Sequence, residues 1–152
     1  MNDVSVLIPL RDTGSSELII KYLSSMPLCA ENVHITLLHI FRKASSEEEL
    51  MGKGFTEEEL SKFTRILERA KDDLVDIGFL PENIEIRVSS DLYPTVTDGI
   101  IDQFNKSERK FDIVIIRRRK MSKAEEFLVG DVSVKLVRAL EGTSVLVLKT
   151  LK

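Results

Sequence analysis

The chain has almost none of the residues that cross-link a protein or supply large aromatic rings. Among its 152 residues there is one cysteine, Cys29, and there is no tryptophan. A single cysteine excludes an internal disulfide bond, and we therefore expect a reducing compartment. No cation or helix start stands near Cys29 in the sequence to make its thiol reactive. We expect it to be a small, partly buried apolar side chain.

Long apolar runs and an excess of one charge are also missing. No run approaches the roughly 20 apolar residues that cross a bilayer, and Met1-Asn2-Asp3 lacks the basic start of a secretion signal. We therefore expect a cytoplasmic protein without a membrane partner. The 22 lysines and arginines stand against 25 acidic residues, which gives a net charge of −3. This balance argues against nucleic acid as a partner.

The sequence also lacks recognisable catalytic and metal-binding motifs. His34 and His39 stand near the two ends of one predicted strand and, with a single cysteine elsewhere, give no metal-ligand spacing. We expect both to be structural. No Gly-x-Ser-x-Gly elbow and no supported Ser-His-Asp set is present, so we expect that the protein is not an enzyme.

Two aspartates, Asp12 and Asp91, each follow a predicted strand. They either pair to bind a cation or a ribose, or they cap turns and helices. Asp12 is also the carboxylate with which a nucleotide hydrolase of this fold would organise a metal ion.

What the sequence does contain is a regular alternation of strand and helix patterns. Short β-branched or alternating runs predict strands at residues 4–8, 33–41, 84–88, 111–116 and 144–148. Apolar residues at helical spacing predict helices between them, at residues 18–26, 60–77, 96–104 and 132–140. This alternation predicts an α/β fold with a parallel sheet and right-handed crossovers, in a single domain over residues 1–152.

Local signals predict where these helices begin and end. We expect Ser15 or Ser16 to cap the first helix and Pro94 to stand in the first turn of the third. Gly78 and Gly142 are expected to end two of the helices.

The segment after the fourth predicted strand is the most informative part of the chain. In open α/β sheets, a loop that leaves a parallel strand and leads to a helix N-terminus is where phosphate binds. Here we expect that loop to carry cations where a phosphate-binding loop usually carries glycines: Arg117, Arg118, Arg119, Lys120 and Lys123. Either they form an anion site together with Arg11 through bidentate guanidinium contacts, or they are a solvated loop that pairs with Glu125 and Glu126.

Nearly the whole chain resembles the universal stress protein family. The resemblance lies in the run from Val6 to Leu10 with its Pro9, in Leu37-Leu38-His39-Ile40, and in the stretch around Gly130 at residues 127–138. It implies an open, doubly wound, Rossmann-like sheet of five parallel strands in the order 3-2-1-4-5, with helices on both faces. It also implies a binding or signalling module in stress responses, which has a protein partner as one possibility.

The resemblance further implies a homodimer. Family members pair through their fifth strand, which here is Ser144, Val145, Leu146, Val147 and Leu148. An apolar strand at the edge of a sheet also invites pairing on physical grounds.

Members of the family that bind ATP carry two glycines three residues apart, then a glycine followed by serine or threonine. Alignment on Gly130 places Arg117 and Lys120 at the first two glycines and Asp131 at the hydroxyl residue. A non-glycine residue at left-handed φ costs about 1–2 kcal/mol, and Asp131 would occupy the helix N-terminus that attracts phosphate. We therefore expect no ATP in the usual mode and no cofactor.

The alternative is a remodelled basic pocket for ATP, AMP or another phosphate ligand. Arg11 stands where such members carry an aspartate, two residues after Pro9, and Asp12 is shifted by one position. The backbone near Ile40 would contact an adenine, by resemblance. The residues of the candidate site are Pro9, Arg11, Asp12, Ile40, Arg117, Lys120, Gly130 and Asp131.

Overall fold

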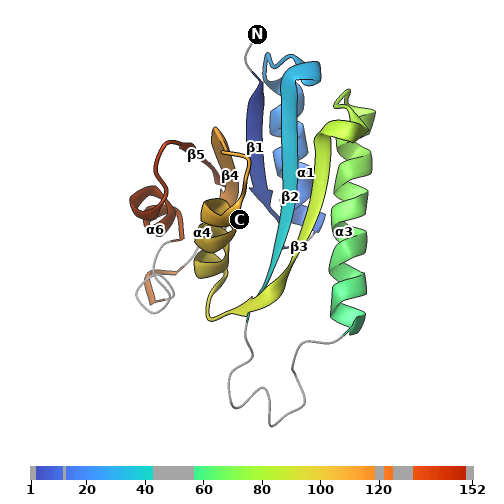
Figure 1. The fold of residues 1–152 in the computed structure, drawn as a ribbon. Coiled ribbons are helices and arrows are strands. Elements are labelled where there is room, and N and C mark those ends of the chain that lie inside the picture. Colours follow the sequence, from blue (N-terminus) through green and yellow to red (C-terminus); the bar gives the residue numbers. More distant parts are fainter. Residues whose placement is uncertain (1–2, 12, 43–56, 119–121, 125–131, 150–152) are drawn as a thin grey trace.

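The protein forms a five-stranded parallel sheet with helices on both faces (Figure 1). The computed structural model describes residues 3–11, 13–42, 57–118, 122–124 and 132–149. The strands are β1 (Val4–Pro9), β2 (Val33–Arg42), β3 (Ile84–Tyr93), β4 (Ile113–Arg118) and β5 (Ser144–Lys149). The helices are α1 (Thr13–Ser25), α3 (Glu57–Asp76), α4 (Val96–Lys106) and α6 (Val132–Ala139). The strand order is β3-β2-β1-β4-β5, which confirms the expected order.

Two apolar layers hold the helices to the sheet. Successive side chains of a strand point to opposite faces, so Ile8 and Leu7 enter different layers. Ile8 packs in a cluster with Ile19 of α1 and Leu67 of α3. Leu7 packs in the other cluster with residues of α4 and α6, including Leu136. Accordingly, α1 and α3 cover one face and α4 and α6 cover the other (Figure 1).

The fourth strand begins and ends two residues later than the sequence pattern predicts. We expected Arg117 and Arg118 in a loop, but β4 continues through them and they pair with Leu148 and Lys149 of β5. The ladder extends because β5 also runs one residue beyond its predicted end. The expectation of a loop at these two positions is therefore wrong, since strand pairing outweighs the charge of the side chains there.

Two predicted helix starts are also wrong. Helix α1 begins at Thr13, so Ser15 and Ser16 lie inside it and not at its N-cap position. Pro94 precedes the N-cap of α4, which is Thr95; the Asp98 N–H donates to Thr95 Oγ1 over 3.1 Å. Helix boundaries are set by the residue that satisfies the first free N–H groups, which the pattern alone does not identify.

The helix ends follow the prediction more closely. Gly78 and Gly142 come shortly after α3 and α6 and have positive φ angles of 115° and 71°. Glycine is favoured there because it has no Cβ to clash in the left-handed region.

Burial differs from the sequence pattern at a few positions. Val132 and Val137 of α6 are 39% and 61% exposed, so they do not belong to the expected buried stripe, whereas Leu136 and Leu140 do. Cys29 is exposed, whereas we expected it to be partly buried.

Among the helices in the described part of the chain, none has the length and apolar character needed to span a bilayer.

Helix α4 approaches the sheet closely at Gly99. A Cβ at this position would stand 2.4 Å from Ile40 Cγ2 and 2.9 Å from a ring carbon of Tyr93. Both neighbours are buried and have little room to move.

We expect Gly99→Ala to lower the free energy of unfolding by about 1–3 kcal/mol, since it overpacks the interface. Chemical denaturation measures this loss. Asn105→Ala, an exposed change on the same helix, should alter stability by less than about 0.5 kcal/mol; equal effects would contradict this account.

Candidate functional site

The candidate site lies where β1 and β4 end side by side. The two strands pair in parallel through Val6 with Ile113 and Leu7 with Val114. Their carboxyl ends therefore meet at the same edge of the sheet, with the strand order reversing between them. This is the topological switch point at which open α/β sheets bind ligands. Beyond β1, the Leu10 N–H donates to the Leu38 carbonyl over 2.8 Å, which fixes the start of the β1–α1 connection.

The described residues include half of the predicted site. Pro9 ends β1 opposite Leu38, and Arg11 follows it as an exposed residue. Ile40 is buried on the face that α4 covers. Arg117 is half-buried at the end of β4. The other predicted residues lie outside the described part of the chain: Asp12, Lys120, Gly130, Asp131, and also Arg119, Glu125 and Glu126.

The sheet separates Arg117 from Arg118. Ile115 packs in the layer of α1 and α3, and Ile116 packs in the layer of α4 and α6. Because directions alternate along a strand, Arg117 points to the α1 side and Arg118 to the α4 side. Arg117 and Arg118, which we expected in one cluster, thus lie on two faces. Of these two, Arg117 shares a face with α1, the helix that follows the β1–α1 connection.

The sheet has an irregularity beside Ile40. The pairing of β2 with β3 shifts register between His39 and Phe41. Such bulges redirect the side chains next to them and are frequent near functional sites. Ile40 lies against Gly99 of α4.

His39 joins three elements next to the switch point. Its side chain is only 7% exposed, and its Nδ1 lies 2.9 Å from the Leu10 carbonyl oxygen. A carbonyl only accepts, so Nδ1 carries a proton and donates. The ring stacks on Phe63 of α3 with centroids 3.8 Å apart and meets Phe41 edge-on at 4.8 Å. These contacts place His39 between α3 and the β1–α1 connection.

Burial lowers the pKa of His39 below its ordinary value of 6.5. The positive charge of Arg11 acts in the same direction, while the hydrogen bond to Leu10 and the charge of Glu59 oppose it. In the fold the ring is therefore neutral at pH 7, with the Nδ1–H tautomer fixed by the Leu10 carbonyl.

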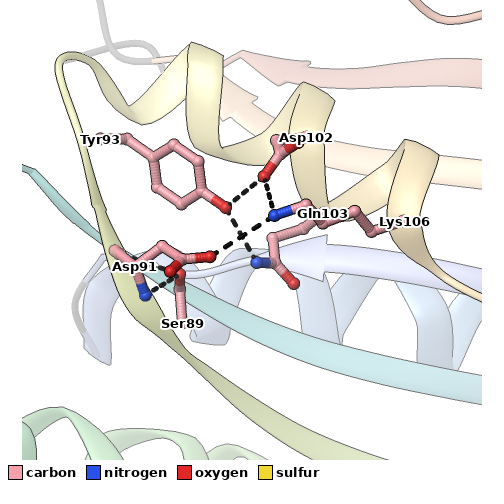
Figure 2. A network of polar contacts seen from close by, with 6 residues as sticks. All are labelled: Ser89, Asp91, Tyr93, Asp102, Gln103 and Lys106. Carbon is pink, nitrogen blue, oxygen red and sulfur yellow. Dashed lines mark hydrogen bonds and ion pairs between the residues drawn. The ribbon is translucent and has the colours of Figure 1, made fainter.

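A polar network ties the end of β3 to α4 (Figure 2). Tyr93 Oη donates to Asp102 over 2.6 Å and accepts from Gln103 Nε2 over 3.0 Å. Lys106 contacts Asp102 at 2.8 Å and Asp91 at 3.5 Å. Hydrogen bonds from Lys106 and Tyr93 lower the pKa of Asp102. The network holds the Tyr93 ring next to Gly99, a position that Ile40 also contacts.

Asp91 is part of this network and not of the switch point. It lies within β3, an edge strand that β2 separates from β1. The expectation that Asp91 follows the third strand is wrong, because β3 continues through it to Tyr93. Ser89 Oγ donates a hydrogen bond to the Asp91 carbonyl and accepts one from the Asp91 N–H. The Asp91 carboxylate accepts from Lys106 Nζ.

The C-terminal end of α4, which carries Gln103 and Lys106 of this network, also borders an open groove of about 690 Å³. Two of its lining residues, Arg87 and Glu85, form an ion pair at 3.2 Å. His34, at the start of β2, contacts Asp3 at 3.3 Å. No group of three or more possible metal ligands occurs among the described residues.

Comparison with known proteins gives structural neighbours only. No family model and no curated protein matches the sequence. A universal stress protein in complex with cAMP has a TM-score of 0.64 and 17% identity, and the match covers 97% of this chain and 98% of that chain. The hypothetical protein MJ0577 has a TM-score of 0.64 and 22% identity, over 99% and 98% of the two chains. The hypothetical protein PH0823 has a TM-score of 0.58 and 15% identity, over 97% of each. The chain therefore has the universal stress protein fold, as the sequence resemblance implied.

The neutral state of His39 makes the stability of the fold depend on pH. Above pH 6.5 both folded and unfolded states leave His39 unprotonated, but below it the unfolded chain takes up the proton first. Stability is therefore lost as pH falls from 6.5 toward the lower folded pKa. Urea unfolding at several pH values measures this loss. His39→Asn keeps an N–H donor for Leu10 and should lose less stability over the same range; parallel curves would contradict the assignment.

Proposed function

We propose that the protein is a non-catalytic binding or signalling module of the universal stress protein type, which acts in the cytoplasm in stress responses. We further propose that it does not hold ATP as the ATP-binding members of that family do. The observation that supports the absence of this ATP-binding mode is the strand conformation of the main chain at Arg117. By resemblance this position matches the first glycine of a phosphate-binding loop, yet here it belongs to β4.

The pairing of Arg117 with Leu148 supports the proposal physically. A glycine loop binds phosphate by turning several backbone N–H groups toward it. At Arg117 the backbone is instead part of the β4–β5 ladder, and a long side chain occupies the space that glycine would leave open. Strand pairing and phosphate wrapping are alternative uses of the same backbone groups.

The second candidate is a phosphate-ligand binder that relies on side chains. One structural neighbour is a universal stress protein in complex with cAMP, which favours a nucleotide as the ligand class. Arg11 is exposed at the end of the β1 segment, and Arg117 points to the α1 side of the sheet. A planar guanidinium binds phosphate oxygens in pairs without a glycine loop. In this candidate, Arg11 and Arg117 supply the charge.

Calorimetric titration with Mg-ATP, AMP and cAMP separates the two candidates. The first predicts no saturable micromolar binding of ATP, because the triphosphate lacks free backbone donors. The second predicts that AMP or cAMP binds, and that Arg117→Ala weakens this binding about tenfold or more through loss of a charged hydrogen bond. Micromolar ATP affinity would contradict the main proposal.

Arg118→Ala is the matched control for this titration. It removes the same side chain one position along the strand, on the opposite face of the sheet. Nucleotide binding that falls equally in both variants would show a general charge effect and would remove the second candidate.

We also propose a homodimer through β5. This strand forms one edge of the sheet, and its four central residues are half-buried and apolar. The adjacent helix α6 adds three exposed valines, Val132, Val134 and Val137. In the described part of the chain, an apolar strand at the sheet edge next to a helix with exposed valines is typical of a protein–protein contact.

Sedimentation at high micromolar concentration tests the dimer and should show a twofold mass. Val137→Lys places a charge on α6, the helix that packs against β5, and should weaken the dimer, while its 61% exposure leaves folding unaffected. Leu92→Lys changes an exposed leucine on β3, the opposite edge, and should leave the dimer intact. A monomer at all concentrations would contradict the proposal.

A further inference from the structure

His39 lies between the helix layer and the connection that borders the switch point. Its Nδ1–H donates to Leu10, and Arg11 is the next residue in the chain. Its ring is stacked on Phe63 of α3. The imidazole is thus a rigid contact that positions the segment carrying Arg11.

Charged groups face this imidazole from two elements. Arg11 acts on it from the β1–α1 connection, and Glu59 acts from α3. Lys62 of α3 lies 5.5 Å from the centre of the Phe63 ring, on which His39 stacks. The ring is nearly inaccessible to water, whereas Arg11, Glu59 and Lys62 are exposed. Their charges therefore act on His39 through partly screened interactions.

We propose that His39 links the binding of a phosphate-like dianion beside Arg11 to the uptake of a proton. The inference rests on the second candidate function, in which Arg11 contacts the phosphate. His39 is a positioning residue in this account: it does not touch the ligand but holds and senses the segment that does.

The direction of the linkage follows from charge. Without a ligand, the positive charge of Arg11 disfavours a second positive charge on His39. A dianion beside Arg11 offsets that repulsion and favours the imidazolium. By reciprocity, the protonated protein binds the dianion more tightly by the same factor.

Protonation of His39 does not break its hydrogen bond to Leu10 in the β1–α1 connection. The imidazolium keeps the Nδ1–H that donates to Leu10 and gains a proton on Nε2 only. Stacking on Phe63 places the new charge over an aromatic face, an arrangement that is itself favourable. The link between proton and ligand is therefore electrostatic, and it operates in the folded protein.

Sulfate is the suitable probe, because it remains a dianion throughout the range in which histidine titrates. Histidine NMR titrations of the protein with and without sulfate measure the pKa of His39. Sodium chloride of equal ionic strength corrects for screening. We expect sulfate to raise the pKa of His39, which corresponds to about fivefold or more tighter binding to the protonated form. At each pH, the resonances of His34, at the other end of β2, should be the same in sulfate and in sodium chloride, and they serve as an internal control.

Two variants test the mechanism. Arg11→Gln should raise the pKa of His39 without any ligand and should abolish its response to sulfate. His39→Asn keeps a donor for Leu10 and should bind sulfate with no dependence on pH.

The outcomes distinguish this inference from the function on which it rests. If sulfate shifts the backbone amides of Leu10 and Arg11 but leaves the pKa of His39 unchanged, the anion site stands and the linkage is overturned. If sulfate shifts neither, both the linkage and the second candidate function are overturned. A response of His39 that is equal in sulfate and chloride would reduce the effect to screening and would also overturn the proposal.

Discussion

The parallel pairing of β1 with β4 is the contact on which the rest of the structure depends. It places β1 between β2 and β4 and makes the order of strands reverse at the centre of the sheet. The ends of both strands consequently share one edge, and the connection that carries Arg11 begins there. Helix α1 covers one face of this junction and α4 the other, so that residues at the strand ends are sorted by the face to which they point. A charged side chain at this edge is therefore available only to a ligand on the face to which that side chain points.

Much of the fold could be predicted from local patterns. Runs such as residues 4–8 and 144–148 are apolar because both faces of a parallel strand are covered, and this signal survives in a single sequence. The order of the strands came from the family resemblance, because periodicity does not specify which strands are neighbours. The end of β4 was missed since pairing with β5 carries Arg117 and Arg118 into the ladder. The exposure of Val137 was missed because spacing predicts an apolar stripe whether or not another layer covers it.

The candidate site was predictable only in part. Pro9 and Arg11 follow directly from the position of the first strand, and the structure places both at the switch point. Arg117 and Arg118 point to opposite faces because β4 extends through both of them. The sequence pattern ended the strand at Ile116 and therefore did not predict this separation. The contact of His39 with Leu10 and Phe63 joins three elements, and no local pattern encodes it. The bond of Tyr93 to Asp102 likewise follows from the packing of α4 against β3.

The central claim is that strand pairing and a long cationic side chain occupy the place where a triphosphate would need bare main chain. Its most direct test is the nucleotide content of the freshly purified protein. The protein is denatured, and the released small molecules are separated and measured by absorbance. The account predicts that no ATP is released. ATP released in a one-to-one ratio with the chain would contradict it.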